Sequence, residues 1–205
     1  MFQELHHPLI QHELSLLRQK DCPSPVFRSS VRRVAALMTP YLCADLATTT
    51  TLVTTPLETV EGNCLARPIV LVPILRAGLG FLDGFLDMIP QASVAHIGLK
   101  RDESTLQPKT YYSNLPQGIA ESDVIMLDPM LATGGSAVEA VRQLRAVGVN
   151  SIRFACLVAA PEGVDVFSRA CPEVSIFAAA LDRCLNEHGY ILPGLGDAGD
   201  RLFGT

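Results

Sequence analysis

The sequence predicts an α/β fold with a mostly parallel central sheet that is flanked by helices on both faces. From Ile69 onward, short apolar runs typical of buried strands alternate with stretches whose apolar residues recur at helical spacing. Strands of a parallel sheet show almost continuous apolar runs because both of their faces are covered. A glycine-containing turn follows one of these runs, at the point where doubly wound folds bind their ligands.

The chain begins with a segment that lies outside this alternation. It contains two helical stretches, at about 9–19 and 27–46, and then the threonine-rich run Thr48–Thr55. β-branched residues suit an exposed strand or hairpin, so this run predicts a β-arm. No linker separates the parts, and we therefore expect one domain. Its expected divisions within 1–205 are the N-terminal helices and β-arm (1–60), the core (69–181) and the tail (182–205).

The core is predicted to alternate strands and helices in chain order. Ser136 and Glu139 match a capping box at the start of the helix after the glycines, and Gly148 is placed to end that helix. The tail after Leu181 is rich in glycine and is predicted to be a loop. In order, the core elements are strand Ile69–Leu75, helix Leu79–Ile89, strands Ser93–Leu99 and Val124–Leu127, the helix after the glycines, strand Ile152–Ala159, a helix from near Pro161 to Ala170, and strand Val174–Leu181.

Composition and charge exclude several classes of protein. Hydrophobic residues make up 48% and charged residues 18% of the chain, which indicates a globular protein rather than a disordered one. The net charge of −5 argues against nucleic acid as a partner. No apolar run reaches the roughly 18 residues of a spanning helix, and the N-terminus lacks a signal-peptide pattern, so we expect no membrane partner and a cytoplasmic location. Six cysteines without a C-x-x-C pair favour free thiols over disulfides or zinc.

The segment Val124–Ser136 combines a strand, a glycine turn and a helix start. Its last four residues offer free backbone N–H groups and two hydroxyls at a helix N-terminus, which suits a phosphate monoester. A tight connection capped by threonine or serine explains the same four residues equally well. Because no lysine follows the glycines and the G-x-G-x-x-G spacing is absent, nucleotide triphosphate hydrolysis and dinucleotide binding are disfavoured.

The apolar strand, an acidic residue and Ala132-Thr-Gly-Gly-Ser136 resemble the donor-binding signature of type I phosphoribosyltransferases. Most of that superfamily has two adjacent acidic residues before the loop, whereas here Asp128 is followed by Pro129. This D-P-M-L-A-T-G-G-S variant resembles the uracil phosphoribosyltransferases. Other stretches resemble the same family in the same order and together span nearly the whole chain: His7–Leu9, Val72–Gly80, Arg101–Leu106, Asn186–Asp200 and Leu202–Thr205.

The resemblance implies that the donor is 5-phospho-α-D-ribose 1-diphosphate (PRPP). Asp128 would then bind the ribose hydroxyls, and Ala132–Ser136 would hold the 5-phosphate. Arg76 would clamp pyrophosphate oxygens from a loop that often contains a non-proline cis peptide in the superfamily. By residue type alone, Arg76 is better explained as a helix cap or a solvated side chain. The implied PRPP-binding residues are Arg76, Arg101, Asp128, Pro129, Met130, Leu131, Ala132, Thr133, Gly134, Gly135, Ser136 and Asp197.

Arg101 belongs to a mixed charge run that residue types alone assign to a solvated face. The resemblance instead places Arg101 on a flap that covers the pyrophosphate and excludes water after the donor binds. The family often has an aromatic residue at the position of Lys100, so this sequence departs from the pattern there.

The glycine-rich tail offers little side-chain chemistry and, taken alone, indicates a surface loop. The resemblance makes it a hood over uracil, in which Ile191, Gly196 and Ala198 hold the base through main-chain groups. Asp197 would lie near the ribose and pyrophosphate and also belong to the uracil site. Cytosine would be rejected because its amino group leaves polar groups mispaired. His188 in this loop is expected to be structural rather than a general base.

The implied reaction joins uracil to PRPP, forming UMP and diphosphate in pyrimidine salvage. The expected catalytic residues are Arg76, Arg101, Asp128 and Asp197, and the expected cofactor is Mg²⁺, carried by PRPP and water without direct side-chain ligation. Some family members are activated by GTP and form homodimers or homotetramers, and residues 1–60 could supply such an interface. Two alternatives stay open: a donor-sensing regulator that binds RNA or DNA, and a transferase for purines or orotate.

Overall fold

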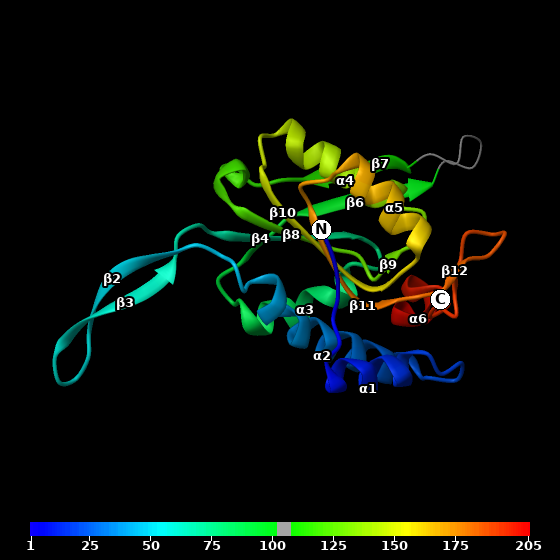
Figure 1. The fold of residues 1–205 in the computed structure, drawn as a ribbon, viewed down its shortest axis with the longest axis horizontal. Coiled ribbons are helices and arrows are strands. Elements are labelled where there is room, and N and C mark those ends of the chain that lie inside the picture. Colours follow the sequence, from blue (N-terminus) through cyan, green and yellow to red (C-terminus); the bar gives the residue numbers. More distant parts are fainter. Residues whose placement is uncertain (102–107) are drawn as a thin grey trace.

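The computed structural model describes residues 1–101 and 108–205, and within these ranges it contains a nine-stranded sheet (Figure 1). The path through the sheet runs β1-β11-β10-β8-β4-β6-β7, while β5 pairs with β4 and β9 with β10. Neighbouring strands are parallel except for β6 and β7. The bounds are β1 Phe2–Glu4, β4 Ile69–Leu75, β5 Ser93–Val94, β6 His96–Arg101, β7 Pro108–Asn114, β8 Asp123–Leu127, β9 Met130–Leu131, β10 Ser151–Ala159 and β11 Ser175–Leu181. The predicted mostly parallel sheet is confirmed.

Helices cover both faces of the sheet, as predicted. Figure 1 shows α1 (Pro8–Leu17), α2 (Ser24–Leu42) and α3 (Leu79–Met88) on one face, and α4 (Gly135–Ala146) and α5 (Pro161–Ala170) on the other. The side chains of β4 alternate between the two layers, with Leu71 in one core and Val70 and Val72 in the other. Successive side chains of a strand point to opposite faces, so one apolar run supplies two cores.

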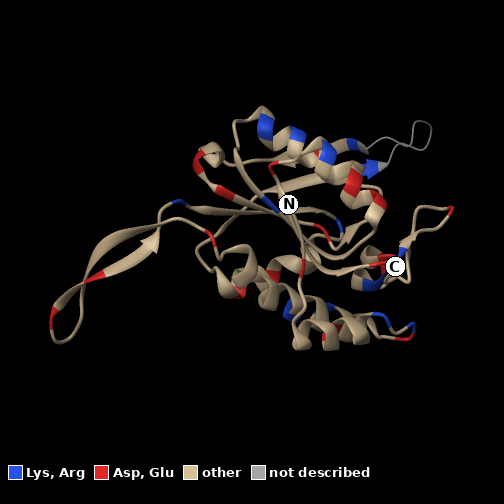
Figure 2. Ribbon diagram, viewed as in Figure 1, with Lys and Arg blue, Asp and Glu red and all other residues tan. Residues whose placement is uncertain are grey.

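The threonine-rich run forms an antiparallel hairpin that projects from the body at the end opposite the C-terminal tail (Figure 1). Its strands are β2 (Thr48–Thr54) and β3 (Thr59–Leu65), and all of their residues are exposed except the half-buried Gly62. All charged residues between Thr48 and Leu65 are acidic, as Figure 2 shows. The prediction of an exposed hairpin is confirmed.

Two local predictions were wrong. The capping box does not form, because α4 begins at Gly135 after a left-handed Gly134, without a side-chain cap. Glu139 instead accepts hydrogen bonds from Arg142 and Gln143. Gly148 does end the helix, as predicted, with a left-handed φ of 89° and its N–H bonded to an α4 carbonyl.

The second correction concerns the tail, which is more than a loop. It contains a short hairpin of β12 (Cys184–Leu185) and β13 (Ile191–Leu192), followed by α6 (Ala198–Phe203). These elements are two to six residues long, too short to show a hydrophobic period. The helix is stabilised at its start by Asp197, whose side chain accepts the N–H of Asp200.

No helix within 1–101 and 108–205 is long and apolar enough to cross a membrane. The assignment of the whole chain to one domain, with its three divisions, stays a prediction.

Candidate active site

The candidate active site is a cavity at the carboxyl ends of the parallel strands, with a volume of about 350 Å³. Loops that follow parallel strands converge at this edge, which is where ligands of doubly wound folds bind. One wall comes from the turns after β4 and β8, and the other comes from the tail. The lining residues are Ala77, Asp128, Met130, Ala132, His188, Gly189, Tyr190, Ile191, Gly196, Asp197, Ala198 and Gly199.

The turn after β8 is fixed to the sheet by backbone hydrogen bonds. The N–H of Asp128 donates to a carbonyl of β10, and the Pro129 carbonyl accepts the Leu157 N–H at 3.0 Å. Gly134, with φ 81°, then turns the chain into α4. The position of the turn therefore depends on backbone hydrogen bonds to a strand of the central sheet.

The predicted donor residues of this turn divide into two groups. Asp128, Met130 and Ala132 line the cavity, whereas Pro129 and Leu131 are buried beneath it. The remaining four lead into the helix N-terminus beside the cavity, where both hydroxyl-bearing residues are exposed: Thr133, Gly134, Gly135 and Ser136.

Asp128 is the most strongly perturbed carboxyl group of the cavity. Burial raises the pKa of Asp128 from 3.8 to about 7, and the hydrogen bond from the Met130 N–H only partly opposes this effect. Asp128 as a whole residue is half-buried and lines the cavity, so a ligand with hydroxyl donors can contact it. A carboxyl group that titrates near neutral pH in a cavity is typical of functional sites.

Arg76 lies at the end of β4, next to the tail. The Leu75–Arg76 peptide is cis, as the resemblance implied. The guanidinium donates to Asp200 at 3.1 Å and lies 6.0 Å from the centre of the Phe203 ring. More than half of this side chain is exposed, so it can reach an anion in the neighbouring cavity.

Glycine at position 78 allows the turn after β4 to approach β8. A Cβ atom there would lie 2.3 Å from the Leu127 carbonyl oxygen, which is far inside van der Waals contact. The two strand ends that carry Arg76 and Asp128 are thereby brought close together. Arg101 ends β6, but its side chain lies outside the described residues, as do the flap residues 102–107.

The tail forms the second wall, and the predicted hood residues all line it: Ile191, Gly196, Asp197 and Ala198. Ile191 is buried, and Gly196 adopts a left-handed φ of 72°. The side chain of Asp197 caps α6 through the Asp200 N–H at 3.0 Å. The structure thus brings the predicted donor turn and the predicted hood to one cavity.

Sequence reasoning missed four residues of this site. Gly189, Tyr190 and Gly199 line the cavity, and Asp200 pairs with Arg76. These residues lie within a stretch that resembles the family, but their partners come from distant turns and cannot be read from spacing. His188 also lines the cavity, although its ring is largely exposed beside Glu187.

Comparison with known proteins decides the family. The family model described as uracil phosphoribosyltransferase matches residues 4–205. The chain belongs to this family. Two curated uracil phosphoribosyltransferases, from Ligilactobacillus salivarius and Enterococcus faecalis, are 53% and 49% identical over 205 residues, covering 100% of this chain and 98% of each relative.

Solved structures agree with this uracil phosphoribosyltransferase assignment at the level of the fold. A protein from Aquifex aeolicus superposes with a TM-score of 0.95 at 39% identity, covering 100% of this chain and 99% of that one. A hypoxanthine-guanine phosphoribosyltransferase from Bacillus anthracis has a TM-score of 0.55 at 12% identity, over 78% of this chain and 80% of that one. The second likeness shows a shared phosphoribosyltransferase fold alone.

Proposed function

We propose that this chain is a uracil phosphoribosyltransferase that converts uracil and PRPP to UMP and diphosphate in pyrimidine salvage. The observation that carries the proposal is the meeting of the turn at 128–136 and the hood at 186–200 in one cavity. A donor and a planar base must both reach that cavity for the transfer to occur. Family membership and relatives of about 50% identity over the whole chain support the choice of uracil.

In the proposed reaction, uracil N1 forms a bond to C1 of the ribose as the bond from C1 to the pyrophosphate oxygen breaks. The N1 proton is released, and positive charge develops at C1 while negative charge develops on the leaving group. Arg76 donates to the departing oxygens with its fixed fork of N–H groups, and Arg101 is proposed to assist from the flap. Asp128 accepts hydrogen bonds from the ribose hydroxyls.

Positioning supplies the rest of the rate enhancement in this mechanism. The N–H groups at Ala132–Ser136 hold the 5-phosphate at the start of α4, where the helix dipole favours negative charge. Main-chain groups at Ile191, Gly196 and Ala198 hold the base, and Asp197 faces the ribose and pyrophosphate. Holding both bound reactants in one geometry converts a bimolecular reaction into an effectively unimolecular one.

The residues of the cavity fit Mg²⁺ that arrives with the donor. Asp128 and Asp197 both line the cavity, and carboxylate oxygens with water are what Mg²⁺ prefers. No group of three or more His, Cys, Asp or Glu suited to a metal is found within the described part of the chain. We therefore propose that these two carboxylates face the ion through its water shell. The ion would neutralise charge on the pyrophosphate.

We further propose a cytoplasmic location, because PRPP is a charged intracellular metabolite. By the same family resemblance, we propose a homodimer or homotetramer and activation by GTP. Light scattering during size-exclusion chromatography tests the assembly, and turnover with and without GTP tests the effector. A monomer, or turnover insensitive to GTP, would contradict the respective proposal.

The decisive experiment is a base-competition assay. Purified protein with PRPP and Mg²⁺ is given uracil, hypoxanthine or orotate, and diphosphate release is measured. We expect release with uracil alone, because orotate needs a cation against its carboxylate and the hood contributes no lysine or arginine to the cavity wall. Absence of diphosphate with uracil would overturn the proposed function.

A further inference from the structure

The hood at 186–200 is contacted by an ion pair, between Arg18 and Asp182, that does not line the cavity. Arg18 follows α1, and Asp182 follows β11. Their side chains form two hydrogen bonds, from Arg18 Nη2 to Asp182 Oδ1 at 2.6 Å and from Nη1 to Oδ2 at 2.9 Å. Asp182 is almost completely buried, and neither residue lines the proposed active site.

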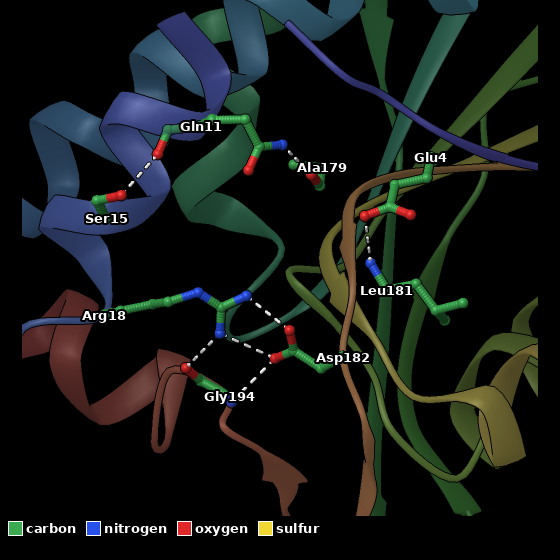
Figure 3. A network of polar contacts seen from close by, with 8 residues as sticks. All are labelled: Glu4, Gln11, Ser15, Arg18, Ala179, Leu181, Asp182 and Gly194. Carbon is green, nitrogen blue, oxygen red and sulfur yellow. Dashed lines mark hydrogen bonds and ion pairs between the residues drawn. The ribbon is translucent and has the colours of Figure 1, made fainter. Parts of the chain in front are cut away.

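Both backbone groups of Gly194 join this ion pair, as Figure 3 shows. The Gly194 N–H donates to Asp182 Oδ2 at 2.9 Å, and the Gly194 carbonyl accepts from Arg18 Nη1 at 3.0 Å. One arginine and one carboxylate thus hold a peptide segment of the hood from both sides. Charge-assisted bonds with this forked geometry fix position more tightly than neutral ones.

The two holding residues are themselves attached to the central sheet. The Asp182 N–H donates to the Ala159 carbonyl at the end of β10 at 2.8 Å. Helix α1 is tied to β11 through Gln11, whose amide donates to the Ala179 carbonyl at 3.1 Å (Figure 3). Gly194 is therefore positioned relative to β10, the strand to which the donor turn is hydrogen-bonded.

The attachment of Gly194 bears on two residues that come shortly after it in the chain. Gly196 and Ala198, two and four residues after Gly194, present the main-chain groups that we propose to hold the base. A side chain can change rotamer to recover a hydrogen bond, whereas a main-chain group moves only if the chain path moves. Displacing Gly194 should therefore displace the base-binding groups while leaving the turn at 128–136 in place.

We propose that Arg18 and Asp182 are positioning residues for uracil, acting through the backbone of Gly194. This inference rests on the proposed function and adds two residues that act at a distance from the base. Arg201 provides a separate attachment of the hood, because its guanidinium donates to the Leu195 carbonyl at 2.8 Å and to the Gln19 carbonyl at 2.6 Å. The hood of an Arg18 variant should therefore remain folded but be less well positioned.

The test compares Arg18→Ala with a matched control that removes another arginine–carboxylate pair involving the α1 region. Arg33 makes an equally short bidentate pair with Glu13 of α1, at 2.6 and 2.8 Å, but it joins α1 to α2 and not to the hood. In Arg18→Ala, we expect the KM for uracil to rise about tenfold or more while the KM for PRPP changes by less than about twofold. Arg33→Ala should leave both KM values unchanged, although both variants should lose thermal stability.

Chemical rescue separates positioning from general destabilisation. A cavity of about 270 Å³ lies behind the hood, bordered by Arg18, Pro193 and Gly194, so a free guanidinium ion can reach the vacated position. Millimolar guanidinium should lower the uracil KM of Arg18→Ala and leave that of Arg33→Ala unchanged. Parallel rises of both KM values, an unchanged uracil KM or the absence of rescue would each overturn the inference. Failure of the wild-type protein to turn over uracil would instead overturn the proposed function.

Discussion

The two walls of the cavity are built in different ways. The donor turn at 128–136 is fixed by backbone hydrogen bonds to β10, between residues of one sheet. The hood at 186–200 contains only short elements and is held by side chains from both ends of the chain, including Arg18, Asp182 and Arg201. Substitutions near the turn should therefore affect the chemistry of the donor, whereas substitutions behind the hood should affect the base selectively.

The largest expected effect is that of Asp128→Asn. This change keeps the shape of the side chain but removes the negative charge of the carboxylate, which we propose to accept hydrogen bonds from the ribose hydroxyls. We expect kcat/KM to fall by about 1,000-fold with either substrate varied. Steady-state kinetics measures this effect, and a loss confined to the uracil KM would contradict the assignment of Asp128 to the donor half.

Arg76→Ala should have the next largest effect. Removal of its forked N–H donors from the pyrophosphate should lower kcat/KM by about 100-fold. The matched control is Arg32→Ala, because Arg32 also forms an exposed pair, with Asp87 at 2.7 Å, but lies away from the cavity. Exposed pairs contribute roughly 0–1 kcal/mol, so both variants should unfold at nearly the wild-type temperature. Near-normal turnover of Arg76→Ala would remove Arg76 from the proposed site.

The sequence predicts the donor wall of the cavity better than the hood wall, because the two walls are held in different ways. Apolar runs such as Ile69–Leu75 identify strands because burial on both faces leaves a local signal, and β4 matches that run residue for residue. The hood leaves no such signal, since its position depends on contacts like that of Arg18 with Asp182, which are 164 residues apart. The prediction of a capping box was wrong because a left-handed Gly134 turns the chain into α4 without a side-chain cap.

Gly194→Ala tests the hood wall directly and should have an intermediate effect. A Cβ atom at this position would lie 2.1 Å from the Ile191 carbonyl oxygen, and the φ of 65° disfavours any side chain. The segment must shift, so we expect the uracil KM to rise about 30-fold while the PRPP KM changes little. Isothermal titration with each substrate measures the two affinities separately. Equal losses for both substrates would show that the walls are not independent.

The smallest expected effect is a pH dependence confined to the donor wall. Because burial raises the pKa of Asp128 to about 7, the carboxyl group is largely protonated at pH 6 and largely ionised at pH 8. Hydroxyl donors and a bound cation both favour the ionised form, so PRPP binding should release a proton and weaken about tenfold from pH 8 to pH 6. Isothermal titration in buffers of different ionisation enthalpy measures the proton release.

The same shift in pKa makes a prediction about stability of opposite sign. A folded-state pKa raised above 3.8 favours the folded state at low pH, and this contribution is lost as the pH rises through about 7. Asp128→Asn removes the loss, so the free energy of unfolding of the variant relative to wild type should increase from pH 5 to pH 8. Asp128→Asn is also the control for the proton release on PRPP binding, because the PRPP phosphates titrate with both the wild-type protein and the variant. Equal proton release by the two proteins would show that the phosphates, and not Asp128, cause the pH dependence of PRPP binding.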